Sequence, residues 1–237
     1  WPVPIDLPAR VEGQRVMHLQ RRAKYILIEL EQGSLIWHLG MSGSMRLVSP
    51  ATAAAKHDHI DVELDSGQLL RYNDPRRFGC LLWGGSDVLA HPLLSSLGPE
   101  PLDEAFDADY LYQRSKRRKL TVKQFIMDQK TVVGVGNIYA SEALFLAGIL
   151  PARQAARISK QRYQSLVIQI KAVLLAAIAQ GGTSLRDFTQ ADGRPGYFEQ
   201  RLNVYGRAGA ACVGCGSPVQ NRAIGQRASY YCVVCQH

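Results

Sequence analysis

Residues 211–237 read ACVGCGSPVQNRAIGQRASYYCVVCQH, and they hold four of the five cysteines in the chain. Two residues separate Cys212 from Cys215, two more separate Cys232 from Cys235, and sixteen lie between the pairs. A Cys-x-x-Cys turn points two sulfurs at one place, so two such turns at the base of a hairpin supply the four thiolates that tetrahedral zinc prefers. The spacing therefore predicts a zinc ribbon with one structural Zn²⁺.

Two structural disulfides or a thioredoxin-like redox pair are the alternatives to a metal. We see no secretory signal ahead of the cysteines, and neither pair stands where a helix begins, so the spacing favours zinc. The fifth cysteine, Cys80, lies in the apolar run CLLW and is predicted to be a buried thiol.

The rest of the chain is long enough to bury a sizeable core. It has 237 residues, 46% of them hydrophobic, which is typical of one large domain or two moderate domains beside the ribbon. No apolar run approaches the roughly 20 residues that span a bilayer, and a metal motif of reduced cysteines is typical of the cytosol. We therefore expect a cytoplasmic, monomeric protein with no membrane segment.

The charge balance indicates a polyanionic partner. The chain has 28 basic and 20 acidic residues, a net charge of +8 and a pI near 9.4. Residues 194–237 hold five arginines and one acid, and residues 114–123 (RSKRRKLTVK) hold six basic residues and no acid. An isolated charge run is usually a solvated face, but two runs beside a zinc ribbon favour nucleic acid.

Two kinds of periodicity divide the chain. Residues 24–83 contain short apolar or alternating runs separated by polar turns, which predicts five or six strands in an antiparallel sandwich. After a Pro-rich boundary near residue 100 the pattern is helical. Ser159 is the predicted N-cap of a long helix that ends at Gly181, and a shorter helix is expected over 137–148.

These patterns predict the α+β class with three parts. Residues 1–100 form an antiparallel β-sandwich. Residues 101–203 form a helical domain, and residues 204–237 form the zinc hairpin.

Three short stretches are candidates for binding. VGVGNIYASEA (133–143) places glycines and Asn137 at a helix start, where backbone N–H groups attract anions. LGMSGSMR (39–46) and NDPRRFG (73–79) are turns that carry Met41 and Phe78; residue type alone favours burial of both, whereas DNA-kinking proteins insert such side chains between bases. KHDHID (56–61) offers too few ligands for zinc, and we interpret it as a DNA-facing loop or a solvated strand entry.

Taken together, these motifs resemble one family. QRRAKYILIEL, HLGMSGSMR, KHDHID, YNDPRRFG, LGPEPL, VVGVGNIYASEALF, DGRPGYF, VYGR and GQRASYYC occur in order over nearly the whole chain. They look like formamidopyrimidine-DNA glycosylase, the bacterial enzyme that removes oxidised purines such as 8-oxoguanine and then cuts the abasic strand by β,δ-elimination.

The resemblance implies a fold, a partner and a set of roles. It implies a helix-two-turn-helix in the helical domain, double-stranded DNA with oxidised bases or abasic sites as partner, and a place at the bacterial nucleoid. The loop 183–197 resembles the lid over the everted base. The implied roles are DNA wedging or gap filling for Met41, Arg76 and Phe78; phosphate contact for Asn137, Arg227, His57 and Arg118; and sugar chemistry for Lys24.

One feature departs from the family pattern. Members begin Pro-Glu-Leu-Pro-Glu, and the amine of the terminal proline attacks the sugar C1′ while the glutamate transfers protons. Here Pro2 follows Trp1, so its nitrogen is an amide, and that role is not assigned to it. The resemblance therefore predicts an N-terminally truncated copy, whose β-sandwich is incomplete at its N-terminus. An arginine is a poor acid, so phosphate contact suits Arg227 better than the proton donation sometimes assigned to it.

Two other functions remain as alternatives. A glycosylase of the same superfamily acts on oxidised pyrimidines, but the set of Met41, Arg76 and Phe78 and the long loop favour purines. A non-catalytic damaged-DNA-binding protein would hold abasic DNA in a salt-sensitive way without cutting it.

Overall fold

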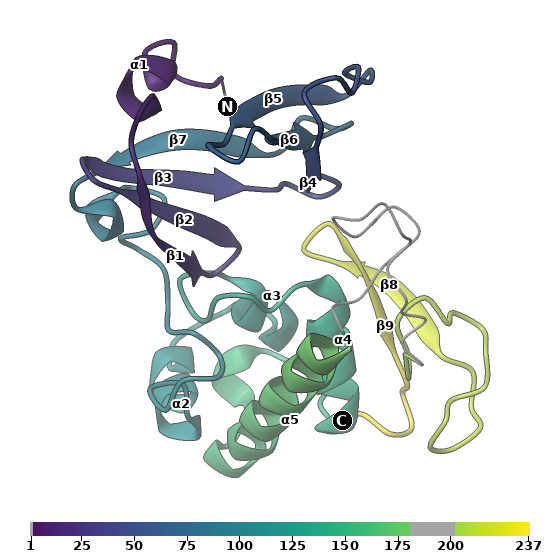
Figure 1. Ribbon diagram of the computed structural model, residues 1–237. Coiled ribbons are helices and arrows are strands. Elements are labelled where there is room, and N and C mark those ends of the chain that lie inside the picture. Colours follow the sequence, from purple (N-terminus) through teal and green to yellow (C-terminus); the bar gives the residue numbers. More distant parts are fainter. Residues whose placement is uncertain (1, 181–201) are drawn as a thin grey trace. The chain divides into compact units, whose positions relative to one another are not determined.

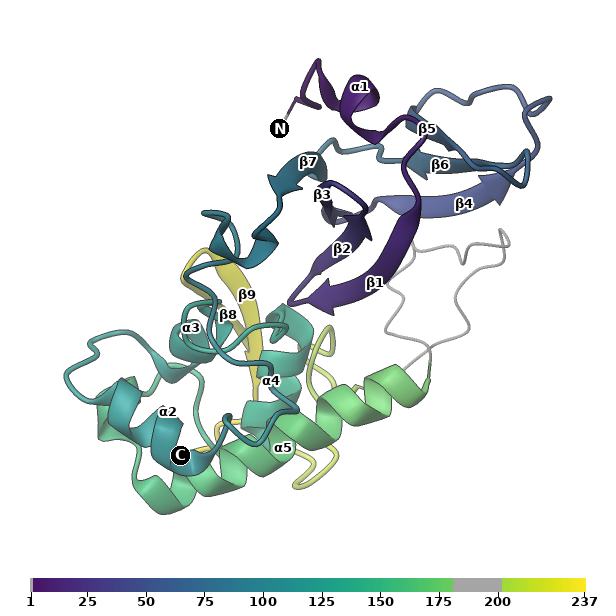
Figure 2. The same cartoon turned by 60° about the vertical axis from the view of Figure 1, so that its left-hand side comes forward.

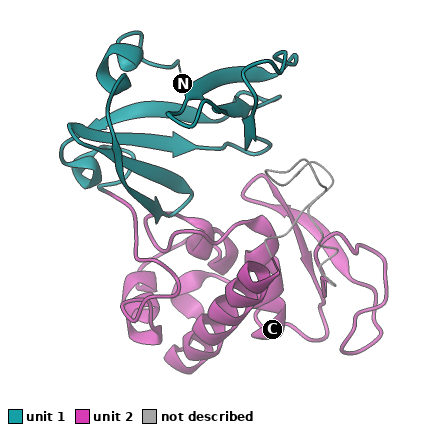
Figure 3. Cartoon of the chain, in the orientation of Figure 1, with its two compact units in different colours: residues 1–95, 181–199 teal, residues 96–180, 200–237 magenta. Residues whose placement is uncertain are grey.

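The computed structural model describes residues 2–180 and 202–237, and these fall into two compact units (Figure 3). The described residues of unit 1 are 2–95, and those of unit 2 are 96–180 and 202–237. The loop expected to act as a lid, residues 183–197, lies outside the described residues.

Unit 1 consists of one short helix, α1 (Leu7–Val11), followed in the chain by the strands of two antiparallel sheets (Figure 1). The first sheet contains, in spatial order, β1 (Val16–Arg22), β2 (Tyr25–Leu30), β3 (Gly33–His38) and β7 (Cys80–Gly85). The second contains β4 (Ser44–Val48), β6 (Leu69–Asn73) and β5 (Asp58–Glu63). A 3-10 turn, η1 (Val88–Ala90), follows β7. The antiparallel sandwich that the sequence predicts is confirmed.

The core of unit 1 joins the two sheets. Trp37 of β3 is fully buried and packs edge-on against Tyr72 of β6, with ring centroids 5.5 Å apart. Leu35 and Leu81 of the first sheet and Leu70 of the second belong to the same cluster. Strand β1 was not predicted, because its side chains are almost all exposed and do not show an alternating pattern.

Unit 2 contains four α-helices, one 3-10 turn and a hairpin within its described residues. These elements are α2 (Ala108–Ser115), α3 (Val122–Met127), α4 (Asn137–Leu146), η2 (Ala155–Arg157), α5 (Lys160–Ala179), β8 (Gln220–Ile224) and β9 (Arg227–Tyr231). The Ser159 side chain accepts a hydrogen bond from the backbone N–H of Arg162, so the predicted N-cap of α5 is confirmed. The α+β class is confirmed as well.

Helix α5 corrects one expectation from the sequence. By length and composition it is apolar enough to cross a membrane, whereas no such run was expected. One face of α5 is buried, because the helix packs on α2 and α4 (Figure 2). Tyr163, Leu166, Ile170 and Leu174 lie in the helical core. A core helix can meet the same criterion as a membrane span, and the buried stripe of α5 is typical of a helix that packs on a core.

The hairpin packs on the helices of the same unit. A small cluster joins Phe145 of α4 to Val204, Cys212, Val219 and Cys232. Near the C-terminus, the buried Gln236 side chain donates to the carbonyl oxygen of Ile149 and accepts from the backbone N–H of Cys232, each at 2.8 Å. The hairpin is therefore fixed to the end of α4 by apolar burial and by hydrogen bonds.

Candidate functional site

The four cysteines of the hairpin converge on one point. The Sγ atoms of Cys212, Cys215, Cys232 and Cys235 all lie within 4.8 Å of one another. Two of the contacts are 3.8 Å (Cys212–Cys235) and 3.4 Å (Cys215–Cys232), and tetrahedral zinc with Zn–S bonds of about 2.3 Å requires sulfurs about 3.8 Å apart. The donor set therefore fits a tetrahedral metal ion.

The pKa values of these thiols show how closely they are placed. Hydrogen bonds from Ser217 and from Cys232 lower the pKa of Cys215 to about 6. The pKa of Cys235 is raised to about 12, above all by its side-chain hydrogen bond with Cys215. Four thiolates at this spacing repel one another, so a bound cation is needed to hold all four deprotonated.

The turn of the hairpin places Arg227 at the start of β9. Gly225 (φ +56°) and Gln226 (φ +61°) form a two-residue turn in which both residues have positive φ, the arrangement favoured by the twist of a hairpin. A Cβ on Gly225 would lie 2.6 Å from Gln124 of α3, so the turn packs closely on that helix. Arg227 is exposed beside this contact.

Lys123 lies beneath the hairpin and was misassigned from the sequence. It counted there as one of six basic residues of a surface run, but it is 1% exposed. Its Nζ donates to the Ala228 carbonyl at 3.0 Å and to the Ser229 hydroxyl at 2.6 Å. Burial and the charge of Arg227 lower the pKa of Lys123 to about 8. A buried lysine therefore fixes the strand that carries Arg227.

Asn137 begins α4 and also contacts the hairpin. Its Nδ2 donates to the Ala228 carbonyl at 3.1 Å and lies 3.4 Å from the Tyr205 hydroxyl. The N-cap of α4 is Gly136, which has no side chain to accept from the first-turn N–H groups. The helix start that the sequence marked as an anion site is thus adjacent to the strand of Arg227.

Glu142, one turn further along α4, is a residue that sequence reasoning missed. It is 3% exposed, and its carboxylate accepts four hydrogen bonds of 2.8–3.0 Å. The donors are the backbone N–H groups of Asn203, Val204 and Tyr205 and the Asn203 amide. An acidic residue inside the apolar stretch ASEALF was the available signal, because a buried carboxylate requires partners.

Arg118 lies elsewhere in unit 2, on the turn between α2 and α3. It follows Arg117, whose φ is +66°, and its side chain is exposed with the other basic residues of the run 114–119. Its backbone is fixed by a hydrogen bond from its N–H to the Ser115 carbonyl at 2.9 Å.

In unit 1, Met41 and Phe78 are exposed, contrary to the expectation from residue type alone. Met41 is 67% exposed and Phe78 56%. The guanidinium of Arg76 lies 4.9 Å from the centroid of the Phe78 ring, so the cation covers one face of the aromatic ring. Apolar side chains in solvent and a stacked arginine are groups that can enter a base stack.

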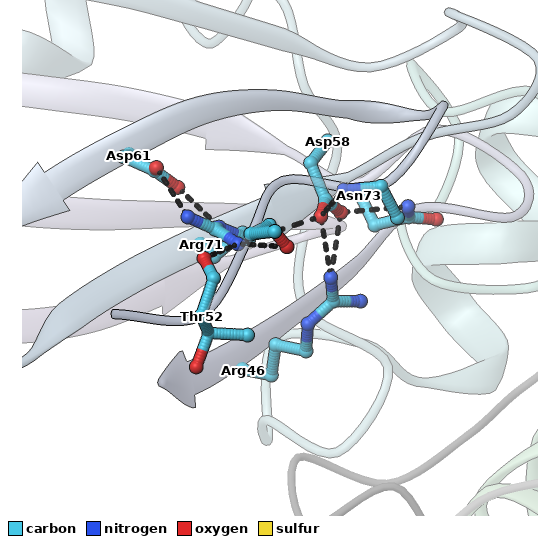
Figure 4. Close-up of polar contacts among 8 residues, drawn as sticks. Arg46, Thr52, Asp58, Asp61, Arg71 and Asn73 are labelled. Atoms are coloured by element: carbon cyan, nitrogen blue, oxygen red, sulfur yellow. Dashed lines mark hydrogen bonds and ion pairs between the residues drawn. The ribbon is translucent and has the colours of Figure 1, made fainter. Parts of the chain in front are cut away.

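His57 precedes Asp58 in the chain, and Asp58 belongs to a buried ion-pair network (Figure 4). Asp58, with a side chain 2% exposed, accepts from Arg46 at 2.6 and 2.8 Å. Arg71, which is 3% exposed, donates to the carbonyl oxygen of Thr52 at 2.9 Å. These bonds tie the loop before β5 to the sheet and present the half-buried His57 at its end. Among the described residues, the four cysteines of the hairpin are the only group of three or more side chains that is close enough to hold a metal ion, and residues 56–61 do not form such a group.

Lys24 lies in the tight turn between β1 and β2, where it is exposed. The turn depends on Ala23, which has a φ of +55°. Burial lowers the pKa of His38, and the nearby charge of Lys24 lowers it further.

Comparison with known proteins identifies similar chains. Two family models match: the formamidopyrimidine-DNA glycosylase N-terminal domain over residues 1–81 and the formamidopyrimidine-DNA glycosylase H2TH domain over residues 97–189. A curated formamidopyrimidine-DNA glycosylase from Stutzerimonas stutzeri is 59% identical over all of this chain and 87% of its own length.

Solved structures agree with these matches. The Lactococcus lactis Fpg protein in complex with abasic-site DNA has a TM-score of 0.90 and 32% identity, covering 98% of this chain and 86% of that one. A variant of the same protein in complex with Fapy-dG DNA has the same TM-score, identity and coverage.

Proposed function

Because the chain belongs to the formamidopyrimidine-DNA glycosylase family, we propose that it is a base-excision repair enzyme that removes oxidised purines from double-stranded DNA and cuts the abasic strand. Its substrates are 8-oxoguanine and formamidopyrimidines, and it works in the bacterial cytoplasm at the nucleoid. The observation that carries the proposal is the exposed set in unit 1, Met41 with Arg76 stacked on Phe78. Exposing the apolar side chains of Met41 and Phe78 to water costs free energy. Insertion of these side chains between DNA bases is the function that would account for their exposure.

Phosphate contacts supply the affinity in this proposal. Arg227, at the hairpin turn, and the uncapped first turn of α4 at Asn137 lie on one surface of unit 2, where Ala228 connects them. An arginine can donate two parallel hydrogen bonds to the oxygens of one phosphate, and the start of a helix offers free main-chain N–H groups. The two groups together are therefore suited to binding the phosphates of a sharply bent DNA strand. Arg118 in unit 2 and His57 in unit 1 contribute further backbone contacts.

Amine chemistry accounts for both reactions. An amine that attacks the sugar C1′ breaks the bond to the base, which leaves with a proton. The nitrogen then expels the ring oxygen O4′, which also takes a proton, so that the opened sugar is bound to the nitrogen as an iminium. The iminium acidifies the neighbouring C2′–H, whose loss expels the 3′ phosphate. The conjugated iminium that forms acidifies C4′–H in turn, and loss of that proton expels the 5′ phosphate. We assign Lys24, exposed in the β1–β2 turn, a place beside this sugar.

The metal of this protein is zinc in our proposal. Four cysteine sulfurs within 4.8 Å form a closed donor set with no position left for a substrate, which is typical of a structural site. The ion holds the base of the hairpin, and through β9 it fixes the strand of Arg227 against Lys123.

Strand cleavage on defined duplexes tests the function. The protein is incubated with duplexes that carry one 8-oxoguanine, one thymine glycol or no lesion, with and without borohydride to reduce an iminium. We expect cleavage at 8-oxoguanine and a reduced covalent complex. Preferential cleavage at thymine glycol would support the pyrimidine class instead, and tight binding without cleavage or trapping would support a non-catalytic reader.

A further inference from the structure

Two loops of unit 1 present the side chains that the proposed function places in DNA. The Met41 loop, residues 39–43, joins β3 to β4, and the Phe78 loop, residues 74–79, joins β6 to β7. The loops touch directly, because a Cβ on Gly40 of the first would lie 2.7 Å from the backbone nitrogen of Gly79 in the second. Their relative position therefore decides how Met41 and Phe78 enter a duplex together.

One buried hydroxyl group lies within hydrogen-bond distance of an acceptor in each loop, and it shares its single proton between them. The hydroxyl of Tyr72, a residue that is 4% exposed, lies 3.1 Å from the carbonyl oxygen of Leu39 in the Met41 loop. It lies at the same distance, 3.1 Å, from Oδ2 of Asp74 in the Phe78 loop. The ring of Tyr72 is fixed from below by Trp37, so the hydroxyl has a set position between the loops.

Asp74 continues this connection into the Phe78 loop. It is 1% exposed, and its carboxylate accepts from the backbone N–H of Gly79 at 2.8 Å and of Arg76 at 3.3 Å. Both ends of the Phe78 loop are thus bonded to one carboxylate. Burial alone would raise the pKa of Asp74, but hydrogen bonds from Gly79, Tyr72 and Arg76 hold it below its usual value, so Asp74 is a carboxylate at neutral pH.

Two glycines make room for the hydroxyl. A Cβ on Gly79 would lie 1.9 Å from the Tyr72 hydroxyl oxygen, and one on Gly43 would lie 2.6 Å from it. Neither glycine has positive φ, so close approach explains them. The sequence thus provides one glycine in each loop for the same hydroxyl.

We propose that Tyr72 and Asp74 are positioning residues that hold the Met41 loop and the Phe78 loop in register for insertion into damaged DNA. The proposal rests on the proposed function. Opening a base stack costs free energy, and loops that are already ordered do not add an ordering cost on binding. Neither residue touches DNA; each acts through Met41, Arg76 and Phe78.

The test uses Tyr72→Phe, which removes the hydroxyl and keeps the buried ring. The probe is a duplex with a tetrahydrofuran abasic analogue and 2-aminopurine opposite it, because insertion of a side chain unstacks that base and changes its fluorescence. We expect about tenfold weaker binding to this duplex, the effect of one lost hydrogen bond. We also expect a smaller fluorescence change at saturation, and affinity for undamaged duplex within about twofold, since phosphate contacts remain.

Two further variants complete the test. Asp74→Asn places an amide N–H group opposite the backbone N–H groups of the Phe78 loop, where a carboxylate oxygen now accepts. It should weaken binding to the abasic duplex and reduce the fluorescence change, as Tyr72→Phe does. Leu35→Val, in the same core but away from both loops, serves as the control for lost stability and should keep the fluorescence change.

The outcomes separate the inference from the proposed function. Full affinity and fluorescence change in Tyr72→Phe and Asp74→Asn overturn the inference, and so does an equal loss in Leu35→Val. If the unaltered protein does not distinguish the abasic duplex from an undamaged one, the proposed function itself fails and the inference falls with it.

Discussion

Glu142→Gln is the substitution that most sharply tests how unit 2 is held together. The carboxylate is 3% exposed and accepts four hydrogen bonds from residues 203–205. A glutamine has nearly the same shape, but its NH₂ group would face two of the four N–H donors. Two bonds to a charged acceptor are then lost, each worth about 1.5–3 kcal/mol, so we expect unit 2 to lose about 3–6 kcal/mol.

The chain provides separate probes for its two units. All three tryptophans, at positions 1, 37 and 83, precede residue 96, whereas α2 to α5 lie in unit 2. Urea unfolding followed by far-UV circular dichroism should show the helical transition about 2 M lower in Glu142→Gln, for a slope of about 2 kcal/mol per M. Glu104→Gln, an exposed change in the same unit, is the control. A shift below about 1 kcal/mol in the helical transition would refute the reasoning, because it would mean that the four bonds add little.

Three further predictions follow from named contacts. Lys123 has a pKa of about 8 in the folded protein, against an ordinary value of 10.5. Because the unfolded chain binds more protons between these two values, the free energy of unfolding should rise by up to about 3 kcal/mol from pH 8 to 10.5. Lys123→Met should lack this rise in urea titrations at several pH values, and an equal rise in the variant would contradict the assignment. Phe78→Ala should change stability by less than about 0.5 kcal/mol, because the ring is 56% exposed, yet weaken binding to abasic DNA; a loss of stability without a loss of binding would reverse that account. Metal analysis should find one zinc per chain, and its removal with a chelator should abolish DNA binding; metal-free protein that binds DNA normally would disprove the structural role.

The sequence predicted those features that depend on residues close together in the chain. Two Cys-x-x-Cys turns bring their own ligands together, so the cluster could be predicted from the spacing alone. Helix α5 followed from its apolar period and from the Ser159 cap. In both cases the decisive interactions span a few residues.

Features that depend on distant partners could not be predicted in this way. Lys123 resembles a surface lysine in a basic run, and its partners Ala228 and Ser229 are more than a hundred residues away. The Tyr72 hydroxyl likewise depends on Leu39, which lies in the loop that follows β3 and is more than thirty residues away in the chain. The exposure of Phe78 could not be predicted from its residue type for a different reason: hydrophobicity predicts burial, whereas this side chain is 56% exposed.

The central claim is that a hairpin arginine and a set of exposed unit 1 side chains recognise damaged DNA, and one binding experiment tests it most directly. Affinity is measured at about 150 mM salt for a duplex with a tetrahydrofuran abasic analogue and for the same duplex undamaged, using the unaltered chain, Arg227→Ala and Arg222→Ala. Both arginines are exposed on the same hairpin, but only Arg227 lies at the turn beside α3. We predict a clear preference for the abasic duplex that Arg227→Ala reduces at least about tenfold and Arg222→Ala largely keeps. Equal affinity for both duplexes, or equal losses in the two variants, would contradict the account.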